Sequence, residues 1–237
     1  FNHTARVCRV GPDGKTYIAL GQPYNVPPPE KMDLYKKTGI GGIIRIDADG
    51  KNREVYATGI RNSVGMDFNT DKSLWFTDNQ VDGMGDDKPP GELNRATKAG
   101  ENFGFPWFGG GAVRTVEYKD QTPPADAVAP QAELPPHAAD LGMTFYNGKQ
   151  FPASYKGGIF IAEHGSWNRT EPVGARVMFA KLGADGKVES VKPFAEGWLT
   201  GDGEYLGRPV DVAVMLDGSL LVSDDSAGAI YRISYEK

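Results

Sequence analysis

The sequence VDVAVMLDGSLLVSDDSAGAIYRI, residues 210–233, holds the most regular pattern in the chain. Two short apolar runs flank the turn Leu216-Asp217-Gly218, and a third run ends in Arg232-Ile233. Aspartate followed by glycine between short β-type runs predicts a hairpin, because glycine readily adopts the positive φ that tight hairpin turns require. The stretch therefore predicts three antiparallel strands joined by short turns.

Three earlier segments repeat this order of an apolar run, a turn, a second apolar run and a third run. They cover residues 7–46, 64–95 and 141–179. Self-similarity of this kind indicates a repeat architecture, in which one supersecondary unit packs against the next. The sequence therefore predicts an all-β fold, a β-propeller of four-stranded antiparallel blades with about four blades present. A β-sandwich or a jelly roll is the alternative that the pattern alone leaves open.

The composition excludes several classes of protein. Among the 237 residues, 31 glycines and 17 prolines are too many helix breakers for a coiled coil, and a hydrophobic fraction of 39% argues against disorder. The formal charge is −5 with no cluster of Lys or Arg, which argues against a nucleic-acid surface. No stretch approaches the roughly 18 apolar residues of a membrane span. The one cysteine, Cys8, excludes an intramolecular disulfide, and we expect its thiol to be buried.

Long connections rich in Pro, Gly and polar residues separate the predicted strands. They cover residues 24–37, 82–90, 106–136 and 165–173. In a propeller such connections gather on one face, where ligands bind. One of them follows a predicted strand as the acidic segment 78–87, whose carboxylates and carbonyls suit calcium although their order is not that of an EF-hand. A solvated acidic turn is the equally weighted alternative.

Two further segments concentrate groups that could bind an anion or an aromatic ring. Arg61 and Asn62 lie side by side between two predicted blades, where the pair could recognise a carboxylate or simply form a turn with an exposed arginine. The segment 163–169 combines an imidazole, an indole and a guanidinium. Its indole could cover a quinonoid ring while its guanidinium meets an anion. The segment lacks the Gly-x-Ser-x-Gly motif of a serine nucleophile.

The three histidines, His3, His137 and His164, do not have the spacing of a zinc site. For each of them taken alone, we expect a surface or packing role.

These segments together resemble the glucose/sorbosone dehydrogenase family, soluble quinoproteins built as six-bladed propellers that use pyrroloquinoline quinone (PQQ) and calcium. The resemblance runs almost from end to end and is strongest to the sorbosone-dehydrogenase-like branch. It rests on His3 and on residues 11–14, 59–65, 83–95, 102–106, 164–169 and 207–209. It implies one propeller domain over residues 1–237 that lacks the N-terminal blades of the family.

The resemblance also implies roles for individual residues. His3 would be the general base that takes the proton from the anomeric hydroxyl of a sugar as hydride moves to the quinone. Arg61 and Asn62 would hold the cofactor, and Arg61 would stabilise charge as the quinone is reduced. Calcium would be held by carbonyls of Asn79, Gln80 or Val81 with Asp86 or Asp87. The cofactor would be lined by His164, Trp167 and Arg169, and Arg208 would pair with one of its carboxylates.

One departure from the family pattern concerns the last blade. In the soluble glucose dehydrogenases a second cationic residue follows the last-blade arginine by two positions, and here Val210 occupies that place. One carboxylate contact would therefore be missing or supplied differently.

The function implied by the resemblance is that of a PQQ-dependent aldose dehydrogenase. Such an enzyme oxidises the aldehyde or hemiacetal carbon of a sugar and passes electrons to a separate acceptor such as a cytochrome or quinone. A periplasmic or secreted location is implied with it. Two alternatives stay open: a non-catalytic propeller that binds calcium, a glycan or a protein, and a metal-dependent sugar lactonase.

Overall fold

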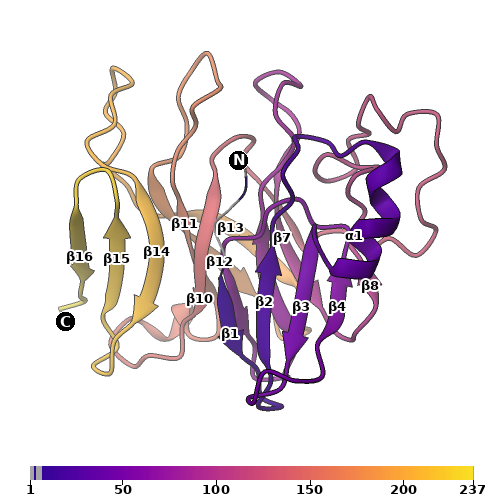
Figure 1. Ribbon diagram of the computed structural model, residues 1–237. Coiled ribbons are helices and arrows are strands. Elements are labelled where there is room, and N and C mark those ends of the chain that lie inside the picture. Colours follow the sequence, from indigo (N-terminus) through magenta and orange to yellow (C-terminus); the bar gives the residue numbers. More distant parts are fainter. Residues whose placement is uncertain (1–2, 4–6, 237) are drawn as a thin grey trace.

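The computed structural model describes residue 3 and residues 7–236, which form four β-sheets (Figure 1). The first sheet contains β1 (Cys8–Val10), β2 (Thr16–Leu20), β3 (Gly42–Ile46) and β4 (Glu54–Thr58), and β8 (Glu101–Asn102) pairs in parallel with β4. The second contains β5 (Met66–Phe68), β6 (Leu74–Asp78), β7 (Gly91–Ala96) and β9 (Ala132–Leu134). The third contains β10 (Asp140–Phe145), β11 (Ile159–Glu163), β12 (Arg176–Leu182) and β13 (Val188–Ala195). The fourth contains β14 (Pro209–Val214), β15 (Leu220–Asp224) and β16 (Ala229–Ile233).

The four sheets are arranged as propeller blades. Their first strands contact one another in sequence, β1 with β5, β5 with β10, and β10 with β14. Each blade continues from its first strand through antiparallel neighbours. The predicted all-β propeller is therefore confirmed. Within the described residues the fourth blade has the three strands that residues 210–233 predict, one fewer than the four strands expected of a complete blade.

The hydrophobic core consists of three clusters, one between each pair of successive blades. Neighbouring residues of a strand point to opposite faces of the sheet, so one strand contributes to two clusters. In β6, Phe76 packs toward the first blade and Trp75 toward the third. In β11, Ile161 packs toward the second blade and Phe160 toward the fourth. This alternation places the second and third blades each between two clusters of the core.

Five hairpins that join neighbouring strands of the sheets share one turn geometry, which explains the repeated Asp-Gly signal. In each, the first residue donates its N–H to the carbonyl four residues on, and the fourth donates back to the carbonyl of the first. The turns cover residues 11–15, 47–51, 69–73, 183–187 and 215–219. The fourth residue has a positive φ and is glycine in all of them except the third, where Lys72 has a φ of 70°. Glycine at this place avoids the steric cost that a side chain meets.

The connection after β2 differs from the irregular loop that its composition predicts, because it contains a short 3-10 helix (Pro29–Lys31) and α1 (Met32–Thr38). No residue from 30 to 38 is glycine or proline, and Gly39 ends the helix with a φ of 73°. A second 3-10 turn covers Ala153–Tyr155. Within the described residues, no helix has the length and apolar character needed to cross a membrane.

The expectation of a buried Cys8 is wrong, because the thiol lies on the solvent side of β1.

Candidate functional site

Asp78, the last residue of β6, holds the connection between β4 and β5 in place. It accepts the backbone N–H of Arg61 through Oδ2 at 2.9 Å and that of Asn62 through Oδ1 at 2.6 Å. Burial raises the pKa of Asp78 to about 6, and the backbone N–H groups of Asn62 and Arg61 act in the opposite direction. The carboxyl group thus fixes the points at which both side chains leave the backbone.

A second buried carboxyl group, that of Glu92, lies opposite Asp78 in the β6–β7 ladder. Glu92 accepts the backbone N–H of Gly111 and the side-chain amide of Asn94, each at 2.8 Å. Burial, followed by the negative charge of Asp78, raises the pKa of Glu92 to about 8. Burial and the neighbouring carboxyl group of Asp78 therefore both favour the protonated form of Glu92.

The guanidinium group of Arg61 is only 4% exposed and is held from two sides. Nε donates to the carbonyl of Asn25 at 3.0 Å, and Nη1 donates to the carbonyl of Asn79 at 3.2 Å. Nη2 lies 2.8 Å from both the side-chain oxygen of Asn25 and Oδ2 of Asp82. Burial lowers the pKa of Arg61, and the charges of Asp82 and Asp78 oppose this shift only in part. Arg61 is thus buried and ion-paired. The alternative prediction, a turn with an exposed arginine, is wrong.

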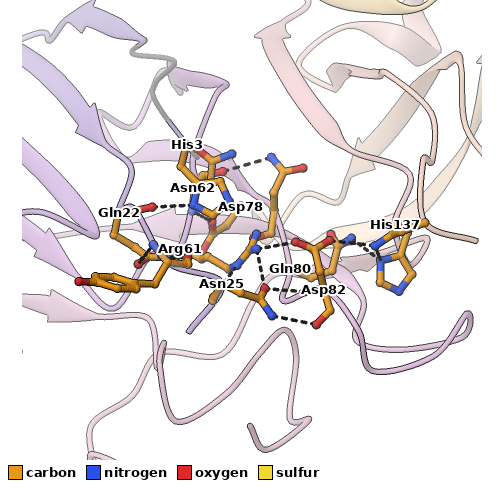
Figure 2. A network of polar contacts seen from close by, with 12 residues as sticks. His3, Gln22, Asn25, Arg61, Asn62, Asp78, Gln80, Asp82 and His137 are labelled. Atoms are coloured by element: carbon orange, nitrogen blue, oxygen red, sulfur yellow. Dashed lines mark hydrogen bonds and ion pairs between the residues drawn. The ribbon is translucent and has the colours of Figure 1, made fainter. Parts of the chain in front are cut away.

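Asp82 connects this arginine to the third blade (Figure 2). Its second oxygen, Oδ1, accepts a hydrogen bond from the side-chain amide of Asn168 at 2.9 Å. Asn25 belongs to the connection after β2, Asp82 to that after β6, and Asn168 to that after β11. Asn25 accepts the backbone N–H of Asp82 at 2.8 Å and donates to its carbonyl at 2.9 Å. Long connections of three blades therefore meet at Asp82, as the predicted gathering of these segments on one face requires.

An open depression of about 900 Å³ lies over this meeting point. It is lined by His3, Asn25, Asp82, Gly83, Gly85, Trp167 and Asn168. The Nδ1 atom of His3 is 2.6 Å from the carbonyl oxygen of Gln22, which can only accept, so Nδ1 carries the proton in the neutral ring. The lone pair of that imidazole is then on Nε2. Trp167 is 75% exposed and presents a flat aromatic surface at this depression.

The residues predicted to hold calcium do not form a cluster of acidic side chains. Asp86 accepts the backbone N–H of Thr170 at 3.0 Å, and Asp87 is almost fully exposed. In the described part of the chain, no group of three or more His, Cys, Asp or Glu side chains is placed to hold a metal. The side-chain oxygens of Asn62 and Gln80 are buried and have no hydrogen-bond partner among the described residues. Neutral amide oxygens of this kind are hard ligands that suit calcium.

Of the other predicted ligands, Asn79 uses its carbonyl for Arg61 and its side-chain amide for the carbonyls of Asn62, at 3.1 Å, and Asp140, at 3.0 Å. Val81 is buried and donates its N–H to the carbonyl of Gly109 at 2.8 Å. These contacts fix the backbone directly after β6.

Arg169 and Arg208 both bind backbone carbonyls at the junctions of the connections. Arg169 donates to the carbonyl of Asp86 and, at 3.4 Å, to that of Pro136. Arg208 donates from Nε to the carbonyl of His164 at 3.0 Å and from Nη2 to those of Gly165 at 2.6 Å and Ser166 at 2.9 Å. Each arginine therefore ties the connection after β11 to a neighbouring blade.

The side chain of His164 points toward the fourth blade, where Nε2 is 2.9 Å from a carboxylate oxygen of Asp225. The structure thus brings His3, Arg61 and Trp167 to one place, with Asn62 adjacent in the chain. His164 and Arg208 form a second group at the junction of the third and fourth blades.

Sequence reasoning assigned no binding or catalytic role to four residues that build the site, namely Asn25, Asp82, Asn168 and His137, for which it predicted a surface or packing role. Asp82 and Asn168 lie inside segments that were recognised, but nothing local indicates that they contact each other across 86 positions. His137 lies between two blades, and its ring contacts Gln80 and Asn168. Only information on which long connections contact one another could have identified these four residues.

The family model described as glucose/sorbosone dehydrogenase matches residues 2–232 of this chain. An uncharacterized protein of Borreliella burgdorferi is 39% identical over 241 residues, which cover 99% of this chain and 61% of that protein. The PQQ-dependent pyranose dehydrogenase of Coprinopsis cinerea is 33% identical over 135 residues, covering 49% of this chain and 18% of that one. The chain thus spans about three fifths of the length of the bacterial relative and less of the fungal one.

A solved structure shows the same fold. The holo form of the PQQ domain of Coprinopsis cinerea pyranose dehydrogenase matches with a TM-score of 0.75 at 20% identity, covering 99% of this chain and 71% of that chain.

Proposed function

The chain belongs to the glucose/sorbosone dehydrogenase family, and from this premise we propose that it is a PQQ-dependent dehydrogenase that oxidises the anomeric carbon of a sugar. One observation carries the proposal: His3, Asp82, Asn168 and the exposed ring of Trp167 line a single depression beside the buried, ion-paired Arg61. A base, a fixed cation and an aromatic surface are the groups that oxidation of a sugar by a bound quinone requires.

The residues around the depression fit a planar, polyanionic quinone. The Trp167 ring is exposed and can stack on a flat ring system. Arg61 and Arg208 both precede the first strand of a blade, and their backbone N–H groups are bonded to the carboxylate that ends its second strand, so both emerge at the same edge of the sheets. Arg169 adds a third guanidinium group from the connection after β11. The three guanidinium groups attract negative charge, which the carboxylates of Asp82 and Asp87, beside Arg61 and Arg169, partly offset.

PQQ, when bound, supplies an acceptor for one hydride, which carries two electrons. This chain would supply the proton transfer through His3, whose Nδ1–H donates to the Gln22 carbonyl and whose lone pair is therefore on Nε2. Nε2 would take the proton of the anomeric hydroxyl, and the bond to Gln22 would orient the ring. Because Gln22 is fully buried and its side chain also contacts the backbone N–H of Tyr24 at 2.9 Å, that carbonyl is a fixed reference point.

Arg61 would stabilise negative charge that develops on the ring system during the reaction. Its guanidinium is held by Asn25 and Asp82 before any ligand arrives, so no reorganisation is needed when the charge appears. Calcium would be bound next to it by oxygen atoms of the segment after β6, which includes the unpaired amide oxygen of Gln80. The proposal includes a periplasmic or secreted location and a separate acceptor, a cytochrome or a quinone.

The proposal is tested by sugar-dependent reduction of a dye acceptor by the purified chain, supplied with PQQ and calcium. We expect activity that requires both additions and that falls about 100-fold or more in His3→Ala, because general base catalysis contributes at least that much. PQQ binding should remain in this variant. Sugar-lactone hydrolysis without PQQ, or calcium binding with neither PQQ binding nor dye reduction, would overturn the proposal in favour of a lactonase or a non-catalytic propeller.

A further inference from the structure

His137 lies in the connection between β9 and β10, outside the set of residues that line the depression. Its side chain is almost completely enclosed, with 3% of the residue exposed. Its backbone has a φ of 63°, in the left-handed region that a non-glycine residue rarely adopts. Such a conformation is energetically unfavourable and persists only where the surroundings fix it. The hydrogen bonds of the ring are part of these surroundings.

Four contacts determine the protonation of the His137 ring. Nε2 is 2.8 Å from the carbonyl of Gly85 and 3.2 Å from that of Lys88, and because carbonyls only accept, Nε2 carries a hydrogen. Nδ1 is 3.1 Å from the side-chain nitrogen of Gln80 and 3.2 Å from that of Asn168, and because these amide groups donate, Nδ1 carries the lone pair. The ring is therefore the neutral tautomer with its proton on Nε2.

These contacts place one ring between two connections. Three of the partners belong to the connection after β6, and Asn168 belongs to that after β11. The Asn168 amide has two hydrogens, of which one is directed at His137 and the other at Oδ1 of Asp82, 2.9 Å away. The other oxygen of Asp82 is 2.8 Å from Nη2 of Arg61. A continuous chain of hydrogen bonds therefore runs His137–Asn168–Asp82–Arg61.

We propose that His137, in its neutral form, is a positioning residue that fixes the Asn168–Asp82–Arg61 chain and so determines the affinity of the site for its quinone cofactor. The inference rests on the proposed function for the identity of that cofactor. Without the lone pair on Nδ1, Asn168 loses the acceptor that orients its amide toward Asp82. Asp82 then still pairs with Arg61, but no residue of the third blade fixes the position of its carboxylate. Outer contacts of this kind typically change affinity or activity about 10- to 100-fold when they are removed.

Three variants separate this role from a general effect on stability. His137→Leu removes all four ring contacts, and His137→Gln keeps one amide donor and one amide acceptor. Tyr146→Phe is the matched control, because this fully buried hydroxyl donates to the carbonyl of Gly218 at 2.8 Å and accepts the N–H of Phe151 at 2.8 Å between the third and fourth blades. All three lose buried hydrogen bonds, but only the first two act on the chain that ends at Arg61.

The first readout needs no cofactor. In a nitrogen-15 spectrum of the full chain, the Nε–H signal of Arg61 is assigned as the one lost in Arg61→Lys. We expect this signal to shift in His137→Leu, to return toward its original position in His137→Gln, and to stay unchanged in Tyr146→Phe. Amide exchange should accelerate in segments 80–88 and 164–170 of His137→Leu alone. If His137→Leu does not fold, Asn168→Leu takes its place, since it cuts the same chain at the next residue.

The second readout is PQQ affinity, measured by quenching of tryptophan fluorescence. We expect the dissociation constant to rise about 10-fold or more in His137→Leu, with substantial recovery in His137→Gln and no change in Tyr146→Phe. An unchanged Arg61 signal and unchanged exchange in both segments would overturn the inference. So would an equal loss of affinity in Tyr146→Phe. If the unmodified chain does not bind PQQ, the proposed function fails, while the nitrogen-15 and exchange results still decide the role of His137.

Discussion

Arg61 and Arg208 have the same backbone contact but different side-chain contacts. Each arginine precedes the first strand of a blade, and its backbone N–H is bonded at 2.9 Å to the aspartate that ends the second strand, Asp78 or Asp224. The Arg61 side chain then meets the carboxylate of Asp82, whereas the Arg208 side chain meets backbone carbonyls from 164 to 166. The same hydrogen bond between an aspartate and the backbone thus supports an ion pair at Arg61. At Arg208 it supports a set of hydrogen bonds that links two blades.

The two aspartates differ in how much compensation they receive. Burial raises the pKa of Asp78 to about 6, and its backbone donors only partly oppose this. Burial acts on Asp224 too, but the N–H groups of Ala227, Arg208 and Ser226 and the hydroxyl of Tyr231 outweigh it and lower the pKa. The difference teaches that the site region tolerates a poorly compensated charge, whereas the tie in the fourth blade is built for stability. Five substitutions, with Asp225→Ala as a control, test this contrast.

Asp82→Ala should give the largest change in stability. It leaves the buried guanidinium of Arg61 without its carboxylate. Because the Asp82 side chain is itself 32% exposed, we expect the lower end of the cost of breaking a buried pair, about 3 kcal/mol. Urea unfolding measures the loss. Asp225→Ala is the control, because Asp225 pairs with His164 but its side chain is 65% exposed, and its removal should cost under about 0.5 kcal/mol. Equal losses in both variants would show that the Arg61 pair is not the special one.

Arg208→Met should destabilise the chain by about 2 kcal/mol, because three backbone carbonyls lose a charged donor. We expect amide exchange of residues 164–166 to rise with it. Thermal unfolding and exchange measure both effects. A normal melting temperature combined with weaker PQQ binding would instead assign Arg208 to the cofactor alone, and the contrast with Arg61 would disappear.

The pH dependence of unfolding should have opposite signs at the two aspartates. The folded state holds the proton of Asp78 more tightly than the unfolded chain, so its contribution to stability is lost between about pH 4 and 6 as the pH rises. Asp224 has a lowered pKa, so its contribution is lost as the pH falls below its ordinary titration range. Each slope is at most about 1.4 kcal/mol per pH unit.

Comparison of Asp78→Asn and Asp224→Asn with the unmodified chain isolates these two slopes. Asp78→Asn should remove a falling slope and Asp224→Asn a rising one. Slopes of the same sign would contradict the contrast.

Trp167→Ala should change stability least, by under about 0.5 kcal/mol, because the side chain is exposed and packs against little. We expect PQQ affinity to fall several-fold, since stacking on the indole is lost. Parallel measurements of melting temperature and PQQ affinity check this. A large loss of stability with unchanged affinity would place Trp167 in the fold and remove it from the site.

The sequence alone predicted the parts of this molecule that depend on neighbours in the chain. Hairpins such as Met215–Ser219 were predicted because aspartate, glycine and apolar alternation act within a few residues. Arg61 and Asn62 were recognised as a polar pair between blades for the same reason. Cys8 was misjudged because an apolar run does not say which face of an edge strand is covered.

What could not be predicted depends on contacts between distant segments. Gln80 and His137 are 57 positions apart, and Asp82 and Asn168 are 86 apart. No local pattern encodes which long connections meet, because that is set by the packing of whole blades. Only the structure therefore shows the ion pair between Arg61 and Asp82. The same holds for the chain of hydrogen bonds that links His137 to this pair.

The central claim is that PQQ binds where the connections of three blades meet around Arg61. Titration calorimetry of the purified chain with PQQ, in the presence of calcium, tests it most directly when it is repeated with Arg61→Met and Tyr146→Phe. We expect binding of one PQQ per chain, retained in Tyr146→Phe and weakened about 10-fold or more in Arg61→Met. Absence of binding to the unmodified chain, or equal binding to Arg61→Met, would contradict the account.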